Sequence, residues 1–138
     1  MVKILLVEDS KFLRIATERA LTRAKYEVST AVDGEEALQM AALKMPDLIL
    51  LDMLLPKLSG PEVLKALKKD PATAGIAVVV LSGLSEKNGE RLKQDGAVCF
   101  LEKSALELEK GADPLLKALE GIVEKVLATK AMGAAGKS

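Results

Sequence analysis

The chain has 138 residues, of which 49% are hydrophobic and 29% charged, so it is long enough for one hydrophobic core and favours a single domain. Lysine plus arginine number 20, as do aspartate plus glutamate, and the formal net charge of +0 offers no overall field to attract nucleic acid or a membrane surface. The sequence has no histidine, no tryptophan and one cysteine, which excludes histidine bases, histidine metal sites, internal disulfides and aromatic platforms for stacking bases.

Five short apolar runs rich in branched side chains predict five strands, over residues 4–7, 28–32, 48–51, 76–81 and 97–101. Continuous hydrophobic strands are typical of a parallel sheet that is covered on both faces, and parallel neighbours need crossover helices. The sequence therefore predicts one doubly wound α/β domain. The first run is too short for a signal peptide and no run is long enough to span a membrane, so we expect a cytoplasmic protein without membrane insertion.

Helical patterns separate the first four runs. The first is predicted over 11–23 with Ser10 as its N-cap, and its inner face is expected to be bracketed by Phe12, Ile15, Ala16, Arg19 and Ala20. The second begins after Asp33-Gly34 and stops before Met45-Pro46, because a residue that precedes proline avoids the helical region. The third begins at Gly60-Pro61 and ends at Asp70-Pro71.

The C-terminal part predicts a short, marginal helix over 85–94 and an exposed loop between Lys103 and Asp113. The last helix has Asp113 as cap and Pro114 at its start, and its apolar stripe must pack on the sheet. After Lys130 the residues are too small to bury much surface. We therefore expect a domain over 1–130 and a flexible tail over 131–138.

Acidic residues follow two of the predicted strands. Glu8 and Asp9 come directly after the first run, and Asp52 comes directly after the third. In an open α/β sheet the binding crevice lies at the carboxyl ends of the strands, and with strand order 2-1-3-4-5 these acids share one pocket. An oxygen-rich site without His or Cys selects a hard cation, for which Mg²⁺ fits best.

Two further groups are expected at the same edge, since Ser82 directly follows the fourth run and Lys103 follows the fifth closely. Carboxylates, a divalent cation, an ammonium and a hydroxyl around one crevice form an arrangement that binds a phosphoryl group. Asp52 is then a candidate nucleophile that forms an aspartyl phosphate.

The segments at 31–38, 46–60, 80–83 and 96–103, after the acidic start at 3–10, resemble successive motifs of the response regulator receiver family of two-component signalling. The likeness covers nearly the whole chain, and several motifs in the expected order are more specific than one acidic pair. The resemblance implies a flavodoxin-like, doubly wound sheet of five parallel strands in the order 2-1-3-4-5, with helices on both faces.

The resemblance also implies roles for the acids. Asp52 is the phosphoacceptor and a ligand of Mg²⁺, Asp9 binds the ion directly, and Glu8 assists through water. The main-chain carbonyl of Leu54 supplies a further metal ligand.

Three more residues gain roles from the resemblance. Ser82 contacts the phosphoryl group, Lys103 pairs with it, and Phe100 is the switch aromatic that moves together with Ser82. One departure is Ser104, which follows Lys103 where the family usually has proline. A cis bond before a residue other than proline costs about 2.5 to 4 kcal/mol, so this loop is expected either to follow a trans path or to hold a strained bond.

By the same resemblance the partners are proteins. A histidine kinase or phosphotransfer protein donates the phosphoryl group, and the face formed by the fourth helix, the fifth strand and the last helix binds a downstream protein, without direct nucleic-acid contact. The chain is expected to accept phosphoryl groups from small acyl phosphates and to lose them by autodephosphorylation, rather than to turn over substrates.

Three alternatives remain open at this point. A Mg²⁺-dependent phosphatase with an aspartate nucleophile should carry a second acid two residues after Asp52, where this chain has Leu54. A flavodoxin-type cofactor carrier should have a loop rich in Ser, Thr and Gly after the first strand, where this chain has Glu-Asp-Ser-Lys. A receiver fold that acts only as a docking module, without phosphorylation, is the third alternative.

Overall fold

A central parallel sheet organises the computed structural model, which describes residues 1–53, 55, 57–82, 94, 96–102 and 113–136. The strands are β1 (Lys3–Val7), β2 (Glu27–Ala31), β3 (Leu48–Asp52), β4 (Ala77–Ser82) and β5 (Cys99–Glu102). Their order is β2-β1-β3-β4-β5, and every neighbouring pair is parallel. The predicted fold class and strand order are confirmed, and the boundaries differ from the predicted runs by at most two residues.

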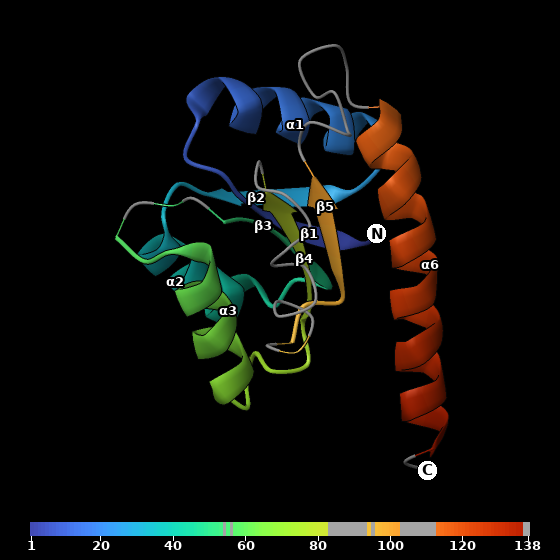
Figure 1. Cartoon of the computed structure of the whole chain (residues 1–138). Helices are drawn as coiled ribbons and strands as arrows, with labels where there is room; N and C mark the ends of the chain where they lie inside the picture. The colour runs from blue at the N-terminus through green and yellow to red at the C-terminus, as the bar shows by residue number, and fades with distance from the viewer. Residues whose placement is uncertain (54, 56, 83–93, 95, 103–112, 137–138) are drawn as a thin grey trace.

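Helices cover both faces of the sheet (Figure 1). In the described part of the chain these are α1 (Lys11–Arg23), α2 (Gly34–Lys44), α3 (Gly60–Lys69) and α6 (Asp113–Gly136). The first three begin at capping side chains, because Ser10, Asp33 and Ser59 each accept a hydrogen bond from a main-chain N–H of the first turn. The predicted helix over 85–94, apart from Gln94, and the whole of the predicted loop between Lys103 and Asp113 lie outside the described residues.

The sheet divides the hydrophobic core into two layers. Leu5, Val7, Ile49 and Leu51 pack on the side of α2 and α3, whereas the alternating residues of the same strands pack on the side of α6, with Leu115, Leu119 and Val123. All five residues of β3 are buried, as a central parallel strand requires. A fully buried Leu or Ile contributes about 1.5 to 3 kcal/mol, so β3 anchors its last residue firmly at the edge of the sheet.

The inner face of α1 differs from the prediction. Phe12 is 72% exposed and Ile15 is 36% exposed, while the buried residues are Thr17, Ala20 and Leu21. Leu21 inserts into the core on the α6 side of the sheet, which rotates the apolar residues of the first turns toward solvent. Of the five residues expected on the inner face, Ala20 is buried as predicted and the other four are exposed, so the apolar pattern misplaced most of this face although it located both ends of the helix correctly.

The last helix also differs from the prediction, because α6 continues to Gly136 beyond the predicted start of the tail at residue 131. The division into a domain and a flexible tail at Lys130 stays a prediction. Among the described helices, none combines the length and the apolar character that a membrane span needs.

Candidate metal centre

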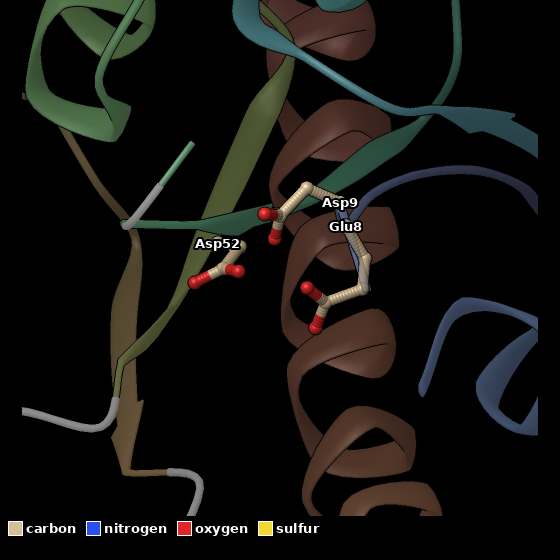
Figure 2. Close-up of side chains that lie close together, drawn as sticks. All are labelled: Glu8, Asp9 and Asp52. Atoms are coloured by element: carbon tan, nitrogen blue, oxygen red, sulfur yellow. The ribbon is translucent and has the colours of Figure 1, made fainter. Parts of the chain in front are cut away.

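Three acidic side chains meet at the carboxyl ends of β1 and β3. Glu8 and Asp9 follow β1, and Asp52 is the last residue of β3. The two strands are parallel neighbours with Val7 opposite Leu51, so the residues that follow them emerge at one edge of the sheet. One carboxylate oxygen of each acid lies within 4.8 Å of the others, and Figure 2 shows the three carboxylates gathered there. The structure thus brings together the acids that the sequence placed in one pocket.

The three carboxylates differ in exposure. Glu8 and Asp52 are each only 4% exposed, whereas Asp9 is exposed to solvent. Like charges this close repel one another, and burial strengthens the repulsion unless hydrogen bonds or a cation compensate. One hydrogen bond comes from the main-chain N–H of Ser10, which lies 3.3 Å from Oε2 of Glu8. A bound cation would reduce the repulsion further.

The donor atoms suit a hard divalent cation. The cluster offers carboxylate oxygens from three acids, which are ligands that Mg²⁺ prefers. Mg²⁺ holds its ligands at about 2.1 Å, so opposite ligands of one ion are about 4.2 Å apart. The 4.8 Å span of the three oxygens is close to that value, and one water between the ion and an acid would accommodate the difference. The residues present therefore fit a magnesium site that opens to solvent beside Asp9.

The loop after β3 is drawn tightly against Asp52. The N–H of Met53 donates to the Leu81 carbonyl (3.1 Å), and the N–H of Gly60 donates to the Met53 carbonyl (3.0 Å). A β-carbon at Gly60 would lie 2.6 Å from Cα of Met53 and 2.9 Å from the carbonyl oxygen of Asp52. Glycine is therefore required at position 60, because any side chain would displace the main chain of Asp52.

An ion pair ties the same loop to the start of α2. Nζ of Lys57 lies 3.6 Å from Oδ2 of Asp33, and Lys57 has a left-handed φ of 68°. Asp33 also caps α2 by accepting from the Glu36 N–H at 2.8 Å. This hydrogen bond, with the charge of Lys57 adding to it, holds the pKa of the Asp33 carboxyl below its ordinary value. No local sequence signal predicts this pair, because its two residues lie on different connections.

Arginine 14 is a second residue to which the sequence assigned no role. It lies on α1, and its Nη1 donates to the main-chain carbonyls of Glu8 (3.1 Å) and Asp9 (3.4 Å). Its own N–H donates to the Ser10 carbonyl at 2.8 Å, so the first turn of the helix places the guanidinium over the acidic segment. The sequence signal that could have identified Arg14 was its position one helical turn after the predicted N-cap, Ser10.

The other predicted site residues are only partly described. Ser82 ends β4 opposite Glu102, which puts its main chain at the same edge as Asp52, but its side chain lies outside the described part of the structure. Leu54 and Lys103 also lie outside the described residues. Phe100 is half-buried on β5 and packs against the core layer of α2 and α3. The proposed roles of these four residues stay predictions.

Comparisons with known proteins agree with this geometry. The family model for the response regulator receiver domain matches residues 4–111. The chain is similar to "Response regulator PleD" from Caulobacter vibrioides, with 44% identity over 103 residues. That match covers 73% of this chain but 22% of PleD, so the chain spans less than a quarter of this relative.

Solved structures show the same fold. The chemotaxis response regulator CheY4 of Vibrio cholerae has a TM-score of 0.79 and 32% identity, and the match covers 88% of this chain and 98% of CheY4. The Mn²⁺-bound form of response regulator Rcp1 has a TM-score of 0.64 and 34% identity, and the match covers 75% of this chain and 81% of Rcp1.

Proposed function

The chain belongs to the response regulator receiver family, and on this basis we propose that it is a phosphorylation-activated signalling protein whose phosphoacceptor is Asp52. The observation that carries the proposal is the buried carboxylate of Asp52 beside those of Glu8 and Asp9. Of these three acids, Asp52 comes from the rigid central strand, which suits a group that must hold a covalent phosphoryl modification in one place.

Magnesium would be held by the carboxylates of Asp9 and Asp52, by the main-chain carbonyl of Leu54 and, through water, by Glu8. When bound, the ion supplies positive charge that neutralises the acids and draws electron density from phosphoryl oxygens. The Mn²⁺-bound form of Rcp1 supports a divalent cation site in a protein of this fold.

The transfer step follows from the chemistry of a carboxylate. An oxygen of Asp52 attacks the phosphorus of a phosphohistidine on the donor, a P–O bond forms while the P–N bond breaks, and the departing imidazole keeps the electron pair. These 138 residues contain no histidine, so a phosphohistidine donor lies outside this sequence, on a histidine kinase or phosphotransfer protein; a small acyl phosphate is the other donor. Lys103 would pair with the transferred group, and Ser82 would donate a hydrogen bond to it.

The signal would leave the site through a change between two states. The new phosphoryl charge draws Ser82 inward, and Phe100 fills the space that is vacated. The half-buried position of Phe100 beside the core supports this movement, since a fully packed ring would have nowhere to go. A downstream protein in the cytoplasm would then read the face formed by the predicted helix over 85–94, β5 and α6. Nucleic acid would not be contacted directly.

Phosphoryl loading tests the proposal. We would incubate the parent protein, Asp52→Asn and Asp47→Asn with acetyl phosphate and Mg²⁺ and measure the intact masses. Asp47 is a matched control because it precedes the opposite end of β3, where its Oδ2 accepts from the N–H of Lys3. The proposal predicts one phosphoryl group on the parent and on Asp47→Asn, and none on Asp52→Asn.

Three outcomes would overturn the proposal. Equal loading of the parent and Asp52→Asn would place the phosphoryl group on a residue other than Asp52. No loading of the parent at all would favour a docking module of receiver fold that is not phosphorylated. Release of phosphate from phosphomonoesters in large excess over the protein would instead indicate a phosphatase with an aspartate nucleophile.

A further inference from the structure

The segment Glu8–Asp9 carries two of the three clustered acids but lies beyond the end of β1. The N–H of Glu8 still donates to the Ala31 carbonyl at 3.1 Å, which extends the pairing with β2 by one residue. Beyond this bond the chain turns away from the sheet into α1. The direction of both carboxylates therefore depends on what holds the main chain in this turn.

Arg14 supplies that restraint from the helix. Its Nη1 carries two hydrogens, and the nitrogen lies 3.1 Å from the carbonyl oxygen of Glu8 and 3.4 Å from that of Asp9. The planar guanidinium is rigid and always charged, so it can hold two neighbouring carbonyls in a fixed relation. Its contact with Glu8 is partly buried, which reduces competition from water.

We infer that Arg14 is a positioning residue for the metal centre, because its guanidinium fixes the main chain of Glu8 and Asp9 and thereby aims both carboxylates toward Asp52. The inference rests on the proposed function, in which these acids hold Mg²⁺. This ion demands a nearly ideal octahedral arrangement, so a small displacement of one carboxylate weakens binding. Groups that orient metal ligands typically change metal affinity by about 10- to 100-fold when they are mutated.

The sequence of α1 offers a matched control. Arg23 is the last residue of the same helix, at the end opposite to the acidic segment, and its Nε donates to the Arg19 carbonyl at 3.4 Å. Replacing Arg23 by glutamine removes the same charge and the same kind of hydrogen bond as replacing Arg14 does. Any difference between the two variants then reports the contact with Glu8 and Asp9.

The test compares Arg14→Gln, Arg14→Lys and Arg23→Gln with the parent in three measurements: the Mg²⁺ dissociation constant by calorimetry, the thermal midpoint without metal, and amide hydrogen exchange at Glu8–Ser10 without metal. We expect Arg14→Gln to raise the dissociation constant about tenfold or more and to speed exchange. Arg14→Lys should weaken Mg²⁺ binding less than Arg14→Gln does, because the lysine ammonium can still reach one of the two carbonyls. The Mg²⁺ dissociation constant of Arg23→Gln should stay within about twofold of that of the parent.

Two results would overturn the inference. If Arg14→Gln bound Mg²⁺ as tightly as the parent and its amide exchange were unchanged, the contact of Arg14 would not orient the acidic segment. A lowered thermal midpoint with unchanged Mg²⁺ affinity would assign Arg14 to stability alone. Absence of Mg²⁺ binding by the parent would overturn the metal role of the proposed function, and the exchange rates without metal would then decide whether Arg14 orders the acidic segment.

Discussion

Two loops meet at the acid cluster, and they are held by different physical means. The loop after β1 carries Glu8 and Asp9 and is held by hydrogen bonds from Arg14 and Ser10. The loop after β3 also has main-chain hydrogen bonds and the Lys57–Asp33 ion pair, but what distinguishes it is close packing at Gly60, where a β-carbon has no room. A hydrogen bond weakens by degrees when its donor changes, whereas a packed glycine accepts no added atom without moving its neighbours. The first loop should therefore respond gradually to mutation, and the second severely.

Replacing the packed glycine should give the largest effect. Gly60→Ala forces the new methyl group against the main chain of Asp52 and Met53, and we expect a loss of about 1 to 3 kcal/mol in the free energy of unfolding. Phosphoryl loading should fall as well, because the main chain that carries Asp52 must shift. Urea unfolding and intact-mass loading of the same samples measure the two effects.

Gly121→Ala is the control for this experiment. A β-carbon at Gly121 has no atom within 4 Å, and the position lies inside α6, so alanine should add about 0.5 to 1 kcal/mol to the free energy of unfolding. If Gly60→Ala were as stable as the parent, close packing would not be what holds the loop after β3.

Each loop leads into a helix through a capping serine, which allows a direct comparison. Ser10 Oγ accepts from the Leu13 N–H, and Ser59 Oγ accepts from the Glu62 N–H, both at 3.4 Å. We expect Ser10→Ala and Ser59→Ala each to cost about 1 kcal/mol in urea unfolding. Only Ser10→Ala should also weaken Mg²⁺ binding clearly, because Gly60 holds the other loop without its cap. Equal weakening by both variants would contradict the distinction between the loops.

The lowered pKa of Asp33 predicts a pH dependence for the second loop. Because the pKa is lower in the folded state, the unfolded chain takes up the proton first as the pH falls below about 4. The carboxylate therefore stabilises the fold at neutral pH, and this contribution disappears as the pH falls through the lowered pKa. Asparagine keeps the cap but not the charge. The difference in the free energy of unfolding between the parent and Asp33→Asn, followed by urea unfolding, should shrink in acid. A difference that stayed constant with pH would show that the charge of Asp33 does not stabilise the fold.

Lys57 should show the smallest effect. Its ion pair with Asp33 is partly exposed and contributes at most about 1 kcal/mol, while its left-handed φ costs a residue with a side chain about 1 kcal/mol or slightly more. The free energy of unfolding of Lys57→Gly should therefore lie within about 1 kcal/mol of that of the parent. It should exceed that of Lys57→Ala by about 1 kcal/mol. Equal stability of the glycine and alanine variants would mean that the backbone is unstrained there.

Much of the fold could be predicted from the sequence because a central parallel strand must be hydrophobic on both sides. The uninterrupted apolar run of β3 and the caps Ser10 and Asp33 carry that information locally. The meeting of Glu8, Asp9 and Asp52 follows once the strand order is known, since it depends only on where parallel strands end.

The remaining features depend on packing between distant segments. The inner side of α1 is set by Leu21 in the core, and the apolar Phe12 and Ile15 misled the prediction. The contact of Lys57 with Asp33 joins two loops that no sequence pattern connects. The helix α6 continues to Gly136, past the position at which the sequence placed the start of the tail.

Mapping the phosphorylated residue is the decisive measurement for Asp52 as the phosphoacceptor. The parent would be loaded with acetyl phosphate and Mg²⁺ and reduced with borohydride, which converts an aspartyl phosphate to homoserine, and its peptides would then be sequenced by mass spectrometry. We expect homoserine at position 52 alone, and none when Mg²⁺ is chelated before loading. Homoserine at position 9 instead, or no homoserine in any peptide of the loaded protein, would contradict this assignment.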